Sequence, residues 1–157
     1  MDIAVRWLAP VRIRAARRGE PLIYACDHLD RLPEDHGWYV FGRRFGDNVE
    51  PIYIGKASDL RRRIEQHLLR NVPLLRAIQD RPKGERVVLV GKWIARPGQQ
   101  EARVLEIVER ALIKKALALG FDIVNVHGTR TPVHNLSMSG AHVAVARLFG
   151  RDVKIEA

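Results

Sequence analysis

Two stretches decide the fold, Gly37–Phe41 (GWYVF) and Ile52–Ile64 (IYIGKASDLRRRI). The first stretch is aromatic and β-branched, which is typical of a strand, and the second begins in the same way. Between them lie Gly46, Asp47 and Asn48, residue types that favour turns. The sequence therefore predicts a hairpin whose loop is slightly longer than the tightest turns.

Strand alternation predicts which side chains of the hairpin share a face. In the second strand it places Tyr53 and Gly55 on one face and Ile52 and Ile54 on the other. Tyr39, on the first strand, can then be a neighbour of Tyr53 across the hairpin. One face is expected to be apolar, and the other can hold two phenols.

A helix is predicted directly after the hairpin. Ser58 and Asp59 offer an N-cap and an acidic first turn. Leu60, Ile64 and Leu68 follow at helical spacing. Three arginines lie among these apolar positions, so this helix is expected to bury one face and to leave another positively charged.

The remaining core elements complete an α/β (α+β) pattern. Arg86–Ala95 (RVVLVGKWIA) is expected to be a third strand, with a bulge at Gly91. Gln99–Leu119 is the longest helical pattern, and Gly120 is a suitable C-terminal stop. The order strand, strand, helix, strand, helix predicts a small, mainly antiparallel three-stranded sheet flanked by helices.

The ends of the chain are predicted to be extensions of this core. We expect an N-terminal extension over residues 1–34, a core over 35–127 and a C-terminal extension over 128–157. Within the last segment, Thr129–Met138 has the composition of a polar loop, and Gly140–Phe149 is expected to form a helix.

The charge of the chain indicates a polyanionic partner. Its 157 residues include 27 Lys and Arg against 18 Asp and Glu, which gives a formal net charge of +9. No apolar run approaches the ~18 residues of a membrane span, so nucleic acid is favoured over a membrane. A basic cluster, Arg12, Arg14, Arg17 and Arg18, can meet phosphates, although a solvated face is the more ordinary explanation.

The number of cysteines gives an indication of the cellular compartment of the protein. Cys26 is the single cysteine, so no internal disulfide can form. The first residues lack the sequence pattern of a secretory signal peptide. A cytoplasmic protein is the simplest expectation.

The motifs resemble a known family of enzymes. Gly37-Trp38-Tyr39 and Tyr53-Ile54-Gly55 resemble the paired GIY and YIG strands of GIY-YIG endonucleases. Ile52–Ile64 and Glu109–Lys115 (ERALIKK) are similar to the nuclease module of the bacterial excision-repair incision subunit. The resemblance covers roughly Gly37–Asn125. The first motif reads GWY instead of GIY, a mild change that leaves its tyrosine in place.

The resemblance implies a metal-dependent endonuclease that hydrolyses DNA phosphodiester bonds. It implies that Tyr39 and Tyr53 position the attacking water, one of them as general base. Arg63 is implied to grip the phosphate, which suits a permanently charged guanidinium. Lys56 would add a cation beside the phosphate. His67, four residues after Arg63 on the same helical face, would help to deprotonate a tyrosine or orient the water.

The resemblance also implies a single metal-binding carboxylate, Glu109. One carboxylate with several waters suits Mg²⁺ (or Mn²⁺). Glu101 and Glu106 are rivals that the ERALIKK match disfavours. The family places an asparagine after this helix, for which Asn125 is the best candidate and Asn135 stays open.

Direct contacts with DNA are expected from three further residues. Gly55 would allow close approach of a ligand at a strand end. Arg61 and Arg62 point away from Arg63 and would bind flanking phosphates or solvent.

Two other functions remain open. The chain could be a catalytically inactive DNA-binding module on the same fold, which would be indifferent to loss of Glu109. It could also be a basic protein that binds a protein partner, whose association would be insensitive to salt. Within the nuclease hypothesis, a stand-alone enzyme of restriction, phage or mobile-DNA, or accessory repair type is favoured. A homodimer would allow both strands to be cut.

Overall fold

A computed structural model describes residues 1–15, 24–125, 134–140, 143–150 and 152–155. The described elements are the following, in chain order: β1 (Asp2–Trp7), β2 (Val11–Ala15), β3 (Tyr24–Cys26), the 3₁₀ turn η1 (Leu29–Arg31), β4 (Gly37–Phe45), β5 (Asn48–Ala57), α1 (Leu60–Arg70), α2 (Val72–Gln79), β6 (Glu85–Ile94), α3 (Glu101–Ala118), β7 (His134–Ser139), α4 (Val143–Phe149) and β8 (Asp152–Ile155). The chain therefore forms a mixed α and β fold.

The predicted hairpin is formed by β4 and β5, which pair antiparallel over their whole lengths. Phe45 pairs with Asn48, so only Gly46 and Asp47 form the turn. The expectation of a longer loop was wrong, because Gly46 adopts a positive φ of 60° that allows a two-residue connection.

A bulge in β5 changes the expected distribution of side chains between the two faces. Phe41 pairs with Tyr53 and Gly42 with Pro51, which leaves Ile52 without a partner. Ile52 consequently packs in the same apolar cluster as Phe41, while Ile54 packs in the cluster on the other face. The prediction that Ile52 and Ile54 share a face was wrong, because an extra residue interrupts strict alternation.

The sheet is larger than the three strands expected. β6 pairs along one edge with β4, and its other edge is shared by β2, near Val88, and β1, near Trp93. The described residues thus form an eight-stranded sheet, largely antiparallel. The N-terminal segment adds strands because the edge of β6 offers backbone groups for pairing. Pairing there also buries the apolar side chains of the segment, such as Ile3 and Val5.

The C-terminal segment also joins the sheet. The polar stretch expected to be a loop contains β7, which runs parallel to β1, and β8 pairs antiparallel with β7. These strands pair through backbone groups at the sheet edge, so their polar composition gave no strand signal. The predicted last helix exists as α4 and begins at Val143.

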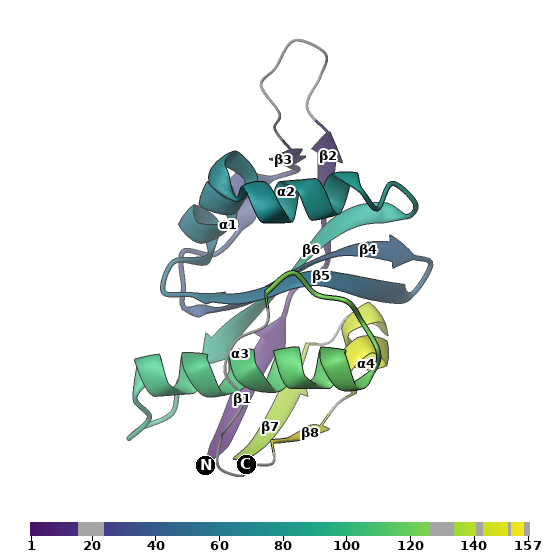
Figure 1. Cartoon of the computed structure of the whole chain (residues 1–157). Coiled ribbons are helices and arrows are strands. Elements are labelled where there is room, and N and C mark those ends of the chain that lie inside the picture. Colours follow the sequence, from purple (N-terminus) through teal and green to yellow (C-terminus); the bar gives the residue numbers. More distant parts are fainter. Residues whose placement is uncertain (16–23, 126–133, 141–142, 151, 156–157) are drawn as a thin grey trace.

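Two helical layers cover the sheet, as Figure 1 shows. α1 and α2 lie on one face, where Leu60, Ile64 and Leu74 pack with Phe41. α3 and α4 lie on the opposite face and pack against a cluster that includes Trp38. The two tyrosines of the hairpin point to the α1 and α2 side.

Two further observations concern the bulge predicted at Gly91 and the possibility of a membrane span. Gly91 makes no bulge: its pairing with Trp38 and Trp7 is continuous, and a Cβ there would lie 2.9 Å from Val5. Among the described residues, no helix is both long enough and apolar enough to cross a membrane.

Candidate active site

The two hairpin tyrosines stack on one another. The ring centroids of Tyr39 and Tyr53 are 6.3 Å apart, and the rings are nearly parallel, at 5°. The edge of Phe41 contacts both rings. Tyr39 is 1% exposed, and Tyr53 is half-buried. The inner phenol is thus held rigidly, and the outer one borders solvent.

Gly55 makes room for the inner phenol. A Cβ at this position would lie 2.3 Å from the Tyr39 hydroxyl oxygen and 2.5 Å from its Cζ. We expected this glycine to allow close approach of nucleic acid. What lies against it is a side chain of the protein itself, and a contact with DNA stays a prediction.

Helix α1 carries two predicted residues to the tyrosines. Its N-terminus is capped by Asp59, whose carboxylate accepts a hydrogen bond from the Arg62 N–H at 3.0 Å. One turn apart, Arg63 and His67 follow on the same face. His67 Nε2 lies 2.6 Å from the Tyr39 hydroxyl, and its ring centroid lies 5.0 Å from that of Tyr53.

Burial dominates the protonation of this cluster. It raises the pKa of Tyr39 well above its ordinary value; the charges of Tyr53 and Glu109 act in the same direction, and Arg63 opposes them. Burial also raises the pKa of Tyr53, again opposed by Arg63. Burial, aided by Arg63, lowers the pKa of His67 to about 4. At neutral pH the cluster therefore holds neutral phenols and a neutral imidazole beside one guanidinium.

Helix α3 lies on the opposite face of the sheet and carries the predicted carboxylate near enough to the tyrosines for its charge to raise their pKa values. Trp38 in β4 donates from Nε1 to the Leu105 carbonyl at 2.9 Å, which fixes α3 to the sheet. One turn further, Glu109 forms an ion pair with Lys56 of β5 at 2.9 Å. The Glu109 side chain is 20% exposed, so its charge is partly desolvated and is balanced by Lys56.

Glu109 could hold a divalent cation only as a single carboxylate whose other ligands are waters. Its rivals have other partners: Glu106 pairs with Arg110 one turn away, and Glu101 lies 2.7 Å from His36 Nδ1. Within the described residues, no group of three or more His, Cys, Asp or Glu side chains comes together. One carboxylate with several waters is an arrangement that Mg²⁺ accepts and that a tightly held Zn²⁺ does not.

Asn125 is tied to the backbone of β5. Its Oδ1 accepts from the Ile54 N–H at 3.1 Å, and its Nδ2 donates to the Ile54 carbonyl. The neighbouring Val124 N–H donates to the Ile52 carbonyl at 2.8 Å. Asn125 thus holds the free edge of β5 just before Gly55. Asn135 lies in β7, and its side chain lies outside the described residues.

Of the two other arginines predicted to bind DNA, one is committed to the protein. Arg61 donates to the carbonyls of Leu32 and Asp30 at 2.9 and 2.7 Å and pairs with Glu34 at 2.6 Å. Arg62 is exposed and lines a pocket beside Arg63. The position of Arg62 suits a flanking phosphate, whereas Arg61 fastens the segment before β4 to α1.

A pocket opens on the outer side of this cluster. It measures about 610 Å³ and lies between the start of α1 and the start of α3. Its lining includes Lys56, Arg62, Arg63 and Gln66. Neither tyrosine nor Glu109 lines the pocket, and Arg63 is the lining residue that also acts on the pKa values of the tyrosines. A phosphate bound there would face Lys56, Arg62 and Arg63, and also the carboxylates of Asp59, Glu101 and Glu106.

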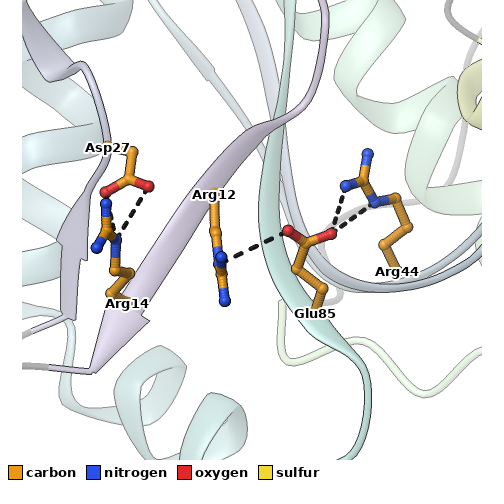
Figure 2. Close-up of polar contacts among 5 residues, drawn as sticks. All are labelled: Arg12, Arg14, Asp27, Arg44 and Glu85. Atoms are coloured by element: carbon orange, nitrogen blue, oxygen red, sulfur yellow. Dashed lines mark hydrogen bonds and ion pairs between the residues drawn. The ribbon is translucent and has the colours of Figure 1, made fainter.

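The basic N-terminal cluster is partly neutralised, as Figure 2 shows. Arg14 lies 2.8 Å from Asp27, and Arg12 lies 3.6 Å from Glu85, which also pairs with Arg44. Both N-terminal arginines are more than half exposed. Arg17 and Arg18 lie outside the described residues. The ion pairs tie β2 to β3 and β6 and give no separate reason for a phosphate site.

One residue of the cluster was missed from the sequence. Asn71 lies between α1 and α2, and its amide nitrogen is 2.7 Å from His67 Nδ1. It also lowers the pKa of Tyr53 through a hydrogen bond. An asparagine two residues before a proline is a helix-capping signal that could have located the turn, and its spacing of four residues from His67 could have indicated the contact.

Comparisons with protein-family models, with curated proteins and with solved structures found no match.

Proposed function

We propose that this chain is a metal-dependent endonuclease of the GIY-YIG type that hydrolyses DNA phosphodiester bonds. The observation that carries the proposal is that side chains from several elements lie near one buried phenol. Tyr53, Arg63 and Glu109 come from β5, α1 and α3, and the charge of each acts on the pKa of the buried Tyr39 phenol of β4. This proximity of groups from four elements supports the proposal, because phosphoryl chemistry needs such groups aligned at one site.

The chain's own residues have distinct roles in this proposal. Arg63 binds the non-bridging oxygens of the scissile phosphate and stabilises the charge of the transition state. Lys56, released from its pair with Glu109, neutralises the same phosphate. Tyr39, held at 2.6 Å by His67, first loses its own proton to solvent and then, as the phenolate, takes a proton from the attacking water.

Glu109 is the residue that would hold the divalent cation. When bound, the cation supplies Lewis-acid stabilisation to the phosphate and to the leaving oxygen. Before the cation binds, Glu109 is paired with Lys56 at 2.9 Å.

An inactive DNA-binding module is a weaker explanation of the same geometry. Binding to a polyanion needs exposed cations, and exposed Lys and Arg side chains serve it. It gives no reason to bury Tyr39 against His67, or to place the carboxylate of Glu109 among the cations, where it repels phosphate.

The test is cleavage of supercoiled plasmid by the purified chain with Mg²⁺ or Mn²⁺, beside EDTA controls. We expect metal-dependent nicking or linearisation, and a loss of at least a hundredfold in Arg63→Ala and in Glu109→Gln. Two matched controls are Arg103→Ala, an exposed arginine of α3, and Glu106→Gln, the neighbouring carboxylate; both are expected to cleave normally.

The other outcomes of the test are equally informative. DNA binding without cleavage on plasmid, nicked and branched DNA, in either metal, would favour the inactive module. Cleavage that survives Glu109→Gln and is lost in Glu106→Gln would move the metal site to the rival carboxylate. Discrete fragments would indicate a restriction-type enzyme, and single nicks an accessory nuclease that acts on one strand.

The assembly that we propose for cleavage of both strands is a homodimer. With one site per chain, cutting both strands is most economical for a homodimer. Sedimentation with and without DNA distinguishes a monomer that nicks from a dimer that linearises.

A further inference from the structure

Asn71 connects α1 to α2 and caps both helices. Its backbone N–H donates to the His67 carbonyl at 3.1 Å, and its Oδ1 accepts from the Leu74 N–H at 3.2 Å. A backbone N–H can only donate, so the atom of the amide that faces Leu74 must be the oxygen. The amino group of Asn71 is therefore the part that faces His67.

The orientation of this amide fixes the proton of the imidazole. Asn71 Nδ2 lies 2.7 Å from His67 Nδ1, and an amide nitrogen has no lone pair to offer as an acceptor. His67 Nδ1 must consequently be the unprotonated nitrogen. In a neutral ring the single proton is then on Nε2, the atom that lies 2.6 Å from the Tyr39 oxygen.

We propose that Asn71 is a positioning residue that fixes His67 as a hydrogen-bond donor to Tyr39 and prevents it from acting as the base of that tyrosine. The tautomer follows from the contacts alone, while its catalytic consequence rests on the proposed nuclease function. A base in the position of His67 would need a lone pair on Nε2, and therefore an acceptor, such as a carboxylate, beside Nδ1. The protein provides a donor there.

The proton sequence follows from this assignment. Tyr39 loses its proton to solvent, and the phenolate is stabilised by the His67 Nε2–H and by the guanidinium of Arg63. The phenolate takes one proton from the attacking water as the water oxygen bonds to phosphorus. The bond to the leaving oxygen breaks, and that oxygen is protonated by solvent. The imidazole stays neutral throughout, in keeping with its burial at 5% exposure.

The discriminating substitution is Asn71→Asp. Aspartate has the same length and can still accept from the Leu74 N–H, so both caps are kept. Its second oxygen accepts instead of donating, which places a proton on His67 Nδ1 and, in the neutral ring, turns Nε2 into an acceptor for the Tyr39 hydroxyl. Asn71→Ser is the second variant, because it keeps a cap and removes the amino group.

The primary measurement is the tautomer itself, read from long-range proton–nitrogen correlations of ¹⁵N-histidine protein at neutral pH. His67→Gln identifies the His67 signals among those of the six histidines. We expect a proton on Nε2 alone in the wild type, a protonated Nδ1 in Asn71→Asp, and mixed tautomers in Asn71→Ser. A wild-type protein with its proton on Nδ1 would overturn the inference, whatever the activity.

Activity then tests the catalytic consequence. We expect Asn71→Asp to lower cleavage at least tenfold at neutral pH and to flatten its rise with pH, since a histidine base would now compete. A predicted wild-type tautomer in a chain that cleaves no DNA would leave the positioning of His67 intact and reject the nuclease proposal. The predicted tautomer shift with an unchanged pH profile would overturn the role of Asn71 in catalysis.

Discussion

Gly55 of β5 pairs directly with Tyr39 of β4, and the phenol of Tyr39 lies in the space that any side chain at position 55 would occupy. The glycine of the second motif and the tyrosine of the first are thus two halves of one packing arrangement. The conformational freedom of glycine is not needed at this extended position; only its missing Cβ is.

Gly55→Ala is expected to displace the Tyr39 ring from His67. The added Cβ would lie 2.3 Å from the phenol oxygen, a distance that real contacts do not reach. We expect a loss of about 1–3 kcal/mol in the free energy of unfolding, as for other overpacked cores, and a fall of at least tenfold in cleavage. Urea unfolding and plasmid cleavage measure the two effects.

A double-mutant cycle isolates the cause. In a Tyr39→Ala background the clash is absent, so Gly55→Ala should then lower the free energy of unfolding only slightly. If the cost of Gly55→Ala is the same in both backgrounds, the glycine is needed for a reason other than the phenol.

Asn125→Leu is expected to loosen the edge of β5 next to the site. The substitution leaves the N–H and the carbonyl of Ile54 without their partner, at a cost of about 2–4 kcal/mol for the two groups. Val124→Ala is a matched control, because the hydrogen bond of that residue to β5 is made by its backbone N–H, which alanine keeps. Hydrogen exchange of the Ile54 amide should accelerate in Asn125→Leu and not in Val124→Ala. Unchanged exchange in Asn125→Leu would contradict the stabilising role of the Asn125 hydrogen bonds.

The local elements of the site could be predicted from the sequence, because their signals lie within a few residues. The hairpin, the Asp59 cap and the single face shared by Arg63 and His67 all follow from short-range patterns. The neighbouring tyrosines follow as well, since hairpin register and alternation set them. What failed locally were the loop length, the bulge expected at Gly91 and the bulge at Ile52, although the adjacent Pro51 is a residue that strands tolerate at edges and bulges.

The larger sheet could not be predicted in the same way. β1 and β7 join through backbone hydrogen bonds between segments far apart in the chain, and local periodicity does not encode such pairing. The contact of Asn71 with His67 is local, since the two residues are four apart at the end of α1, but sequence spacing does not show that the ring of His67 turns to Tyr39. Tertiary contacts of this kind decide which capping residue also becomes part of a site.

His67 is expected to make the protein sensitive to mild acid. Its folded pKa of about 4 lies below the ordinary 6.5, because the ring is buried and lies near the charge of Arg63. The ring also contacts Tyr39, Tyr53 and Asn71. As pH falls, the unfolded chain takes up this proton first. The stability that the neutral imidazole contributes to the folded state is complete above pH 6.5. It is lost as the pH falls to about 4, and the loss is roughly 3 kcal/mol at most.

Urea unfolding between pH 7 and 4 checks this expectation. His67→Gln, which cannot titrate, should lose less stability than the wild type over that window. Parallel curves for the two proteins would mean that the ring takes up its proton equally in both states. Circular dichroism at pH 7 verifies that the variant is folded before the comparison is made.

Tyr39 and Tyr53 are expected to differ sharply when each loses only its hydroxyl. Tyr39→Phe removes the proton acceptor and leaves the His67 Nε2–H without a partner, so turnover should fall by 10²–10⁴ and stability by about 1–3 kcal/mol. Tyr53→Phe keeps the stacked ring, and its oxygen borders solvent, so we expect a loss of less than tenfold.

The pH dependence of cleavage identifies which phenol is the base. Tyr39 is faced by Tyr53, Arg63, His67 and Glu109, and its pKa is raised above the ordinary value of 10, chiefly by burial. The phenolate fraction, and with it the rate, should rise about tenfold per pH unit from pH 7 to 9 without levelling off. The same slope should persist in Tyr53→Phe and be absent from the residual activity of Tyr39→Phe. A slope that vanishes in Tyr53→Phe instead would assign the base to the outer phenol, and the buried one would then serve to hold it.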